Sequence, residues 1–302
     1  MIRELYEAGH DVIASDIVSP SETESLFPEG TEYIECDLLG SEGVGAMVEE
    51  AEPDLIFHLA AQSSGGISIS KPLETFRINI IGFINLMEAV RLSGREIRVV
   101  AVGSGEEYGK KDPGQMPLGE DAQVDPANPY AASKASQTVI AIQYHRTYGI
   151  DVMATRSFNH TGPGQTDTFV FPSFARKCSE IASGLRKPLL RTGNLDIVRD
   201  FTDVRDVVTA YRLLAAEGIP GKVYNVCSGE GLKLRDGLDI IIAQFDIDVE
   251  IGRDPDLFRP ADVPVFIGDN SRLSDETGWK RKIPAAKMMS DLVEYWRSRY
   301  SS

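Results

Sequence analysis

The stretch Ile97-Arg-Val-Val-Ala-Val-Gly103 decides the fold of this chain. Its apolar residues do not alternate strictly with polar ones, which is typical of a strand that is covered on both faces. A helical segment, Tyr130–Tyr148, and a second strand, Val152–Ser157, follow it along the chain. The order strand, helix, strand predicts two parallel neighbours joined by a crossover helix.

The same alternation extends outward over most of the chain. The other candidate strands are Asp11–Ser15, Tyr33–Cys36, Leu55–Leu59 and Val223–Cys227. The other candidate helices are Ile2–Ala8, Gly43–Glu50, Leu73–Leu92 and Val204–Ala216. We therefore predict an α/β fold, a Rossmann-like doubly wound parallel sheet. The pattern loosens after Ser157, where a helix near Phe174–Ser183 and segments from Leu234 to Arg299 predict a smaller C-terminal substrate domain.

The beginning of the chain departs from this pattern. In a dinucleotide-binding sheet, a first strand and a Gly-rich turn precede the first helix and bring the pyrophosphate to the N-terminus of that helix. Here Met1–His10 already reads as the helix, and Asp11–Asp16 reads as the second strand. We therefore expect a sheet that lacks its first strand and Gly-rich turn, as in a chain truncated at its start. Backbone groups on two neighbouring strands would then lack that partner.

The composition argues against several classes of protein. The chain has 302 residues and is 42% hydrophobic, which is enough for a large core. Its 31 basic and 46 acidic residues give a net charge of −15, and no basic stripe indicates nucleic acid as a partner. No apolar run reaches the roughly 18 residues of a membrane span, so we expect a cytoplasmic protein without a membrane partner. We expect reduced thiols and no metal, because metal-ligand spacing is missing among Cys36, Cys178, Cys227, His10, His58, His145 and His160.

Tyr130-Ala-Ala-Ser-Lys134 carries the main chemical signal. Tyr130 and Lys134 are four residues apart and lie on one face of a helix. An ammonium beside a phenol favours the phenolate and lowers its pKa, which would let Tyr130 act as a general acid or base near neutral pH. Ser104, arriving from a strand end, would hold the substrate oxygen that exchanges a proton with Tyr130. The alternative is a surface helix pair, because the Tyr-x-x-x-Lys motif is short.

Longer motifs are spread over the rest of the chain. They are His58-Leu-Ala-Ala-Gln62, Asn79-Ile-Ile-Gly82, Phe158-Asn-His-Thr-Gly-Pro-Gly-Gln165, Arg199-Asp-Phe-Thr-Asp-Val-Arg205, Tyr224-Asn-Val-Cys-Ser-Gly229 and Arg259-Pro-Ala-Asp-Val-Pro264. Nearly the whole chain resembles the extended short-chain dehydrogenase/reductases, the NAD-dependent epimerase/dehydratase family. The last four motifs are similar to those of GDP-4-keto-6-deoxy-D-mannose reductases, and several are shared by GDP-mannose 4,6-dehydratases. The resemblance implies that residues 1–160 with 197–228 bind the dinucleotide and that residues 161–196 with 229–302 bind the nucleotide sugar.

The resemblance also implies catalytic roles. Ser104, Tyr130 and Lys134 match the catalytic triad of the family. Glu106 stands where the dehydratases place the base that removes the proton beside the C4 ketone. Reductases can carry a glutamate at the same place, so Glu106 does not decide the reaction.

Cofactor contacts are implied at three places. Asp16 stands where an acidic residue would accept hydrogen bonds from the adenosine ribose and repel a 2′-phosphate, which favours NAD(H) over NADP(H); the alternative is a turn aspartate. Asp37, followed by Leu38, resembles the residue that contacts adenine, or it caps a helix. The family passes the cofactor across the loop that contains Leu59, Ala60 and Ala61. His58, just before this loop, fits a core histidine better than a catalyst.

The substrate contacts are implied for the downstream motifs. Asn159 follows the last strand of the dinucleotide-binding half, where substrates of the family enter. Arg199 and Arg259 are candidates for the diphosphate, because a guanidinium fork matches phosphate oxygens. The alternative is surface ion pairing with neighbouring aspartates. Lys177 is a weaker third candidate.

We therefore predict a nucleotide-sugar oxidoreductase that reduces the C4 ketone of GDP-4-keto-6-deoxy-D-mannose to give GDP-D-rhamnose. One alternative is a GDP-mannose 4,6-dehydratase with Glu106 as base. Another is a non-catalytic nucleotide-sugar-binding protein, because the Gly-rich turn is missing. The family implies a homodimer, which would pair the helices Leu73–Leu92 and Tyr130–Tyr148 across a two-fold axis.

Overall fold

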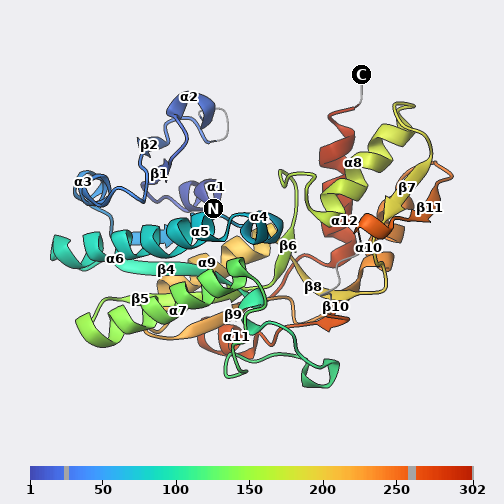
Figure 1. Cartoon of the computed structure of the whole chain (residues 1–302). Helices are drawn as coiled ribbons and strands as arrows, with labels where there is room; N and C mark the ends of the chain where they lie inside the picture. Colours follow the sequence, from blue (N-terminus) through green and yellow to red (C-terminus); the bar gives the residue numbers. More distant parts are fainter. Residues whose placement is uncertain (24–26, 258–262, 301–302) are drawn as a thin grey trace.

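The computed structural model describes residues 1–23, 27–257 and 263–300. Its elements lie in two lobes (Figure 1). The larger lobe, mostly blue to green, holds the parallel sheets and the helices that cover them. The smaller lobe, mostly yellow to red, holds the C-terminal elements. Within the described ranges, no helix combines the length and the apolar character that a membrane span requires.

The main sheet has four parallel strands in the order β3-β4-β5-β9, which are Leu55–His58, Arg98–Ser104, Val152–Ser157 and Val223–Val226. Successive residues of a strand point to opposite faces. Val99 therefore packs with α3 (Ser41–Ala51), α6 (Gly82–Ser93) and α7 (Pro129–Tyr148). Its neighbour Val100 packs with α9 (Val204–Glu217) on the other face. The stretch that predicted a doubly covered strand is thus buried on both sides.

A second, two-stranded parallel sheet consists of β1 (Ile13–Asp16) and β2 (Glu32–Glu35). The chain reaches β1 through α1 (Ile2–Glu7), and α2 (Pro20–Thr23) follows β1. β1 does not pair with β3, so β1-β2 and β3-β4-β5-β9 are separate parallel sheets. A gap between these two neighbours is what a missing first strand would produce, but the missing strand itself stays a prediction.

The predicted helix over Leu73–Leu92 is present in three parts. α5 (Pro72–Phe76) runs into the π-helical turn η2 (Arg77–Ile81), and α6 continues to Ser93. A short helix, α4 (Gly65–Ser70), precedes them. A π turn holds one extra residue without ending the helix, and such turns occur mostly at functional sites. The 3-10 turns η3 and η4 follow β4 at Gly105–Tyr108 and Pro113–Gln115.

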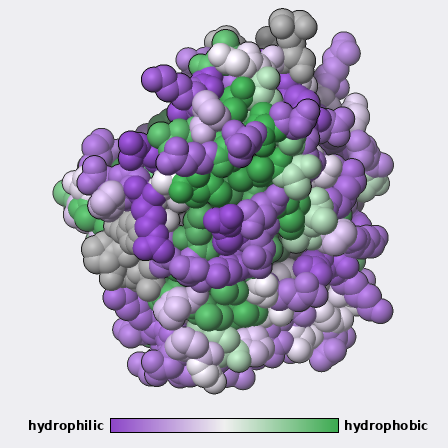
Figure 2. All heavy atoms as spheres, turned by 90° about the vertical axis from the view of Figure 1, so that its right-hand side faces the viewer, coloured by the Kyte–Doolittle hydropathy of each residue, from purple (hydrophilic) through white to green (hydrophobic). Residues whose placement is uncertain are grey.

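The smaller lobe has its own apolar core, to which α8 (Val170–Ala182), α10 (Leu234–Ile242) and α12 (Ala285–Arg297) contribute. Beside the helices lies a parallel pair, β7 (Leu189–Thr192) with β11 (Glu250–Arg253). Figure 2 shows the molecule from the side of this lobe, with hydrophilic side chains around an apolar area. The remaining elements are β6 (Asn159–Thr161), β8 (Val198–Asp203), β10 (Gly231–Lys233), η5 (Pro255–Leu257), β12 (Val265–Phe266) and α11 (Ser271–Thr277). Strands β6, β10 and β12 pair with β8.

Candidate active site

The C-terminal end of β4 and the first turn of α7 bring the predicted catalytic residues together. Ser104 ends β4 and is buried, and Tyr130 lies in the first turn of α7. The Ser104 hydroxyl accepts from the Glu106 N–H at 3.2 Å, and its interaction with the Tyr130 phenol lowers the pKa of that phenol. Lys134 lies one turn further along α7 and is 2% exposed. A hydroxyl, a phenol and an ammonium therefore share one buried site.

The pKa of Tyr130 is raised, which is opposite to the direction predicted from its spacing to Lys134. Burial is the main cause, because it disfavours the phenolate, and the interaction with Ser104 opposes it only in part. The Lys134 ammonium donates to the Val102 carbonyl oxygen at 2.7 Å and to Gln137 Oε1 at 3.0 Å. Lys134 is thus held by β4 and by its own helix, and the buried phenol stays neutral.

A buried carboxylate, that of Glu107, lies behind Ser104. Its Oε1 accepts hydrogen bonds from the Ser104 N–H at 3.0 Å and from the Thr138 hydroxyl at 3.1 Å. Its Oε2 is paired with Arg156 Nε at 3.0 Å. The chain needs glycine at Gly103, because a Cβ there would lie 2.5 Å from Glu107 Oε1. Sequence reasoning assigned no role to Glu107 or Arg156, since only the fold brings β4, β5 and α7 to one point.

An exposed carboxylate stands beside the phenol. Glu106 Oε2 accepts a hydrogen bond from Asn128 Nδ2 at 2.9 Å. Asn128 is also the N-cap of α7, because its Oδ1 accepts from the Ala131 N–H at 2.8 Å. The Glu106 charge contributes to the raised pKa of Tyr130. The pair Asn128-Pro129 is a helix-start signal that sequence reasoning could have used to find this contact.

Asn79, inside the π turn η2, connects the loop after β3 to the catalytic helix. Its Oδ1 accepts from the Gln62 N–H at 2.7 Å, and its Nδ2 donates to the Gln62 carbonyl oxygen at 3.1 Å. The same Nδ2 donates to the Ser133 hydroxyl at 2.8 Å, and that hydroxyl donates to the Tyr130 carbonyl oxygen at 2.7 Å. Asn79 therefore fixes the position of the loop relative to the turn that carries Tyr130.

A nicotinamide cofactor fits the loop after β3. Leu59 is 49% exposed and Ala60 is also exposed, so this loop offers small and apolar groups at the edge of the sheet. Ala61 follows and is half-buried. Gln62 Oε1 is buried and has no hydrogen-bond partner among the described residues, so it remains available as an acceptor. In open α/β sheets, ligands bind at this carboxyl edge.

His58 ends β3 as a core residue, as expected. It is 3% exposed, and its ring lies 5.0 Å from that of Phe83. Burial lowers the pKa of His58 to about 3, and the Lys134 charge adds to this. His58 is thus neutral. Its Nε2 has no hydrogen-bond partner within the described part of the chain, so the side chain is less well satisfied than expected.

Asp16, the acidic residue expected at the adenosine ribose, accepts hydrogen bonds within the turn that follows it. Asp16 ends β1, and its Oδ1 accepts from the Ile17 N–H at 2.7 Å and from the Val18 N–H at 3.3 Å. The carboxylate is exposed at the carboxyl edge of β1. The turn role that was the alternative for Asp16 is therefore present, and a ribose contact stays a prediction.

Asp37 follows β2 and also forms a turn. Its Oδ1 accepts from the Leu39 N–H at 2.9 Å, and its carbonyl oxygen accepts from the Gly40 N–H at 3.0 Å. Gly40, and not Asp37, is the N-cap of α3, so the helix-cap alternative for Asp37 is wrong. Leu38 packs against the core, where a Cβ on Gly82 would lie 3.2 Å from the Leu38 Cβ. Contacts of Asp37 and Leu38 with adenine therefore stay predictions.

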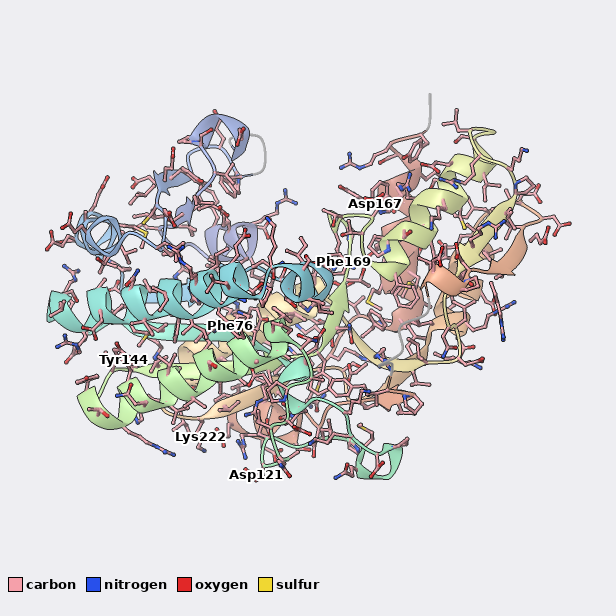
Figure 3. All side chains as sticks on the ribbon, viewed as in Figure 1. Phe76, Asp121, Tyr144, Asp167, Phe169 and Lys222 are labelled. Carbon is pink, nitrogen blue, oxygen red and sulfur yellow. The ribbon has the colours of Figure 1, made fainter. Side chains whose placement is uncertain are left out.

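The predicted substrate residues are spread between the lobes. Asn159 is exposed at the start of β6, where the chain passes toward α8; Figure 3 shows Asp167 and Phe169 further along this connection, between the lobes. Arg199, on β8, donates to a backbone carbonyl oxygen, that of Val263, at 2.6 Å. Arg259 lies outside the described residues, so its convergence with Arg199 stays a prediction.

Lys177 belongs to a cluster of cations that sequence reasoning did not recognise. A cavity of about 330 Å3 is lined by Lys177, Arg186, Lys187, Leu189 and Arg191. The pKa of Lys177 is lowered, first by burial and then by the charges of neighbouring arginines. Arg186 is paired with Glu180 at 2.6 Å, whereas no ion pair of the described chain involves the other three cations. The density of basic residues between α8 and β7 could have revealed this cluster in a chain of net charge −15.

The structure offers no second type of centre. Among residues 1–23, 27–257 and 263–300, no group of three His, Cys, Asp or Glu side chains could hold a metal ion. The three cysteines are free and buried.

Comparisons with known proteins place the chain in a family. Residues 2–292 match the family model of GDP-mannose 4,6 dehydratase. GDP-6-deoxy-D-mannose reductase from Pseudomonas aeruginosa is 36% identical over 275 residues, which are 91% of this chain and 89% of that protein. GDP-mannose 4,6-dehydratase from Vibrio cholerae serotype O1 is 28% identical over 288 residues, with 85% and 76% of the two chains covered.

A solved structure shows the same fold with a cofactor. RMD from Pseudomonas aeruginosa, complexed with NADPH, matches with a TM-score of 0.84 and 33% identity over 92% of this chain and 94% of that chain. Because that relative holds NADPH, the preference for NAD(H) over NADP(H) that Asp16 suggested is not supported. The family match over nearly the whole chain shows that the chain belongs to the extended short-chain dehydrogenase/reductases, the NAD-dependent epimerase/dehydratase family, through its GDP-mannose 4,6-dehydratase members.

Proposed function

We propose that this protein reduces the C4 ketone of GDP-4-keto-6-deoxy-D-mannose to give GDP-D-rhamnose. The observation that carries this proposal is the half-buried Tyr130 phenol, whose raised pKa keeps it neutral, one helical turn from Lys134 in a chain similar to a GDP-6-deoxy-D-mannose reductase. A neutral phenol is a proton donor, which suits reduction of a ketone. When bound, a nicotinamide cofactor supplies the hydride that C4 receives.

The side chains of the protein donate the proton and position the sugar. Tyr130 gives its proton to O4 as the ketone becomes an alcohol. The Ser104 hydroxyl donates a hydrogen bond to O4 and orients the carbonyl, while Lys134 holds a positive charge beside the phenol that has lost its proton. Positioning of this kind supplies much of the rate acceleration in such reactions.

The nucleotide part of the substrate is proposed to meet the cations of the smaller lobe. Residues 161–196 with 229–302 would bind the nucleotide sugar, and residues 1–160 with 197–228 would bind the cofactor. Asn159, Lys177, Arg199 and Arg259 remain the proposed substrate contacts. The cavity beside Lys177 supports this division, because three of its cations have no ion pair within the described chain and the substrate brings two phosphate charges.

A GDP-mannose 4,6-dehydratase is the second candidate. It is supported by Glu106, whose carboxylate is exposed beside the phenol and fixed by Asn128. In that reaction Glu106 would remove the proton beside a C4 ketone, and the cofactor would not be consumed. The protein family includes both reaction types.

Product analysis separates the two reactions. The protein is incubated with GDP-4-keto-6-deoxy-D-mannose and either NADH or NADPH, and loss of absorbance at the reduced nicotinamide band is followed together with product chromatography. In a parallel reaction GDP-mannose and oxidised cofactor are supplied alone. Formation of GDP-D-rhamnose in the first reaction supports the reductase, and formation of the 4-keto sugar from GDP-mannose supports the dehydratase. Calorimetric binding of GDP without binding of NADH or NADPH would instead indicate a non-catalytic nucleotide-sugar-binding protein.

We also propose a homodimer that pairs α5–α6 and α7 with their copies. These helices lie side by side on one face of the larger lobe (Figure 1). Apolar side chains are exposed on them, with Leu73 at 72%, Ile81 at 46% and Val139 at 68%. Large apolar groups so exposed on adjacent helices indicate a surface that is covered by another molecule. Sedimentation at micromolar concentration tests this, and Val139→Glu should convert the dimer to a monomer.

A further inference from the structure

We propose that Glu107 is a positioning residue, which fixes Ser104 through its backbone and supplies the buried negative charge that the Lys134 ammonium requires. The proposal deepens the proposed function, because it rests on Ser104 and Lys134 being two of its three catalytic residues. Glu107 itself touches neither a substrate nor a cofactor position. It acts through the residues around it.

The surroundings of Glu107 show that it is held as a carboxylate. Both oxygens face donors only: the Ser104 N–H and the Thr138 hydroxyl at Oε1, and Arg156 Nε at Oε2. The Arg156 guanidinium also lies over the Tyr108 ring, 4.7 Å from its centroid, and is itself buried. The Ser104 N–H and the Arg156 guanidinium can only donate, so these two groups favour the carboxylate over the protonated acid. Burial raises the pKa of Glu107, while the guanidinium and the two hydrogen bonds counter that effect.

The positions of Lys134 and Glu107 along β4 bring the two charges together. Lys134 Nζ donates to the carbonyl oxygen of Val102, and Glu107 accepts from the N–H of Ser104, two residues further on the same strand. Thr138, which also donates to Glu107, lies one turn after Lys134 on the same face of α7. The ammonium and the carboxylate therefore face the same end of β4.

Among the described residues, Glu107 is the one carboxylate whose charge raises the pKa of Lys134. From β3, His58 is buried and neutral, and from α7 itself Tyr130 is neutral. Glu106 is exposed to solvent and bonded to Asn128, so its charge is screened. The direct partners of the ammonium, Val102 and Gln137, are uncharged. Arg156 from β5 has the same sign and acts on Lys134 only by keeping Glu107 ionised.

The consequence is a defined pH dependence. Burial lowers the pKa of Lys134 to about 8, and the Glu107 charge is what keeps it from falling further. Without that charge, Lys134 loses its proton at a lower pH. The positive charge beside Tyr130 is then lost within the physiological range, although every contact to the substrate is intact.

The test titrates Lys134 directly. Protein labelled with 13C and 15N at lysine is followed by NMR from pH 6 to 11, and the Lys134 signal is assigned by its loss in Lys134→Met. We expect a midpoint about one pH unit or more lower in Glu107→Gln than in the parent. The matched control is Glu120→Gln, which removes a half-buried carboxylate without removing the charge that acts on Lys134. Glu107→Asp keeps the charge and should keep the midpoint near that of the parent.

A second variant tests the proposal if Glu107→Gln does not fold. The double variant Glu107→Leu with Arg156→Met removes both charges of the buried pair, so that no unpaired charge is left in the interior. Proteins often tolerate such a replacement of a buried ion pair by apolar residues. Its Lys134 midpoint should again be lower than in the parent. If turnover is found, the alkaline limb of kcat/KM must move together with the NMR midpoint.

Equal midpoints in the parent, Glu107→Gln and Glu120→Gln overturn the proposal, as does an equal shift in both single variants. The NMR titration needs no substrate and no cofactor. Absence of ketone reduction would therefore refute the proposed function and leave the assignment of Glu107 to be decided by the titration alone.

Discussion

Burial raises the pKa of Tyr130, in the first turn of α7, and so favours the neutral phenol. This state determines the direction of proton transfer. A neutral phenol gives a proton to a developing alkoxide, and it regains that proton from solvent or from a relay before the next cycle. The raised pKa of Tyr130 thus agrees with an acid role in reduction better than with a base role.

Replacement of Tyr130 by phenylalanine tests that role. Tyr130→Phe removes the proton donor and should lower kcat by about two to four orders of magnitude, the range expected for loss of a general acid. The matched control is Tyr144→Phe on the same helix, whose hydroxyl donates to Glu88 at 2.7 Å and lies far along α7 from the site (Figure 3). Steady-state kinetics should show turnover near the parent value for the control. Parent-like turnover of Tyr130→Phe would exclude Tyr130 as the donor.

His58 makes stability depend on pH in the acid range. Its pKa is about 3 in the folded chain and about 6.5 in an unfolded one, so the unfolded chain binds more protons between these values. The free energy of unfolding should therefore fall as the pH falls from 6.5 toward 3, by up to about 1.4 kcal/mol per pH unit from this group. His58→Gln should flatten that dependence. Urea unfolding of both proteins at pH 7, 5.5 and 4.5 measures the difference, and parallel curves would contradict the assignment.

At the scale of elements, the π turn η2 determines where Asn79 lies. The extra residue in that turn leaves Asn79 fully buried, where it makes three hydrogen bonds to the loop after β3 and to Ser133 on α7. The turn therefore connects two elements that carry predicted site residues.

Truncation of Asn79 should be costly. Asn79→Ala leaves buried groups of Gln62 and Ser133 without a partner, so we expect a loss of about 3 kcal/mol in the free energy of unfolding. Asn85→Ala is the matched control on α6, since Asn85 makes one hydrogen bond, to the Leu38 carbonyl oxygen at 2.8 Å. It should cost about 1 kcal/mol. Denaturant unfolding measures the free energy of unfolding of both variants. Equal losses would show that the hydrogen bonds of Asn79 stabilise the fold no more than that of Asn85.

Sequence reasoning located the long elements well and the short ones poorly. The bounds predicted for Val152–Ser157 are those of β5, and α7 begins only one residue before the predicted Tyr130. These elements are set by local apolar patterns. The π turn was not predicted, because one extra residue inside a helix leaves the pattern of apolar residues nearly unchanged. The strands β6, β10 and β12 are short and, like β8, are defined by distant partners, which no local pattern reveals.

Some residues of the candidate site could be predicted from the sequence, and others could not. Ser104, Tyr130 and Lys134 could be found because two of them lie one helical turn apart and the third ends a strong strand. Glu107 could not, because its importance comes from Arg156 and Thr138, which lie on other elements. The direction of the Tyr130 pKa was wrong for a related reason. Spacing shows that Lys134 is near, but only the fold shows how completely the phenol is buried.

On the scale of the whole molecule, charge governs the encounter with a nucleotide. The net charge of −15 repels a diphosphate, and the cations beside Lys177 form a local exception on the smaller lobe. Binding of an anion there should therefore depend on few residues and should weaken as salt rises.

Arg191→Ala tests this exception. Loss of one charge-assisted contact of roughly 1.5–3 kcal/mol should weaken GDP binding by about ten- to a hundredfold. Lys222→Ala is the matched control, because it also removes one positive charge, but from an ion pair with Glu276 near β9 and α11. Calorimetric titration with GDP at two salt concentrations gives both affinities. Equal affinities for the two variants would mean that only the overall charge matters.

The separation of β1–β2 from the main sheet has a consequence for local opening of the fold. A two-stranded ladder is marginally stable by itself, and proteins open locally in cooperative units whose free energies differ widely. In hydrogen–deuterium exchange, the amides of Ile13–Asp16 and Glu32–Glu35 should take up deuterium together and much earlier than those of β4 and β5. Equal protection of both sheets would contradict this. The edge of the molecule nearest Asp16 would then be a region that orders and loosens on its own time scale, while the site around Ser104 and Tyr130 stays in place.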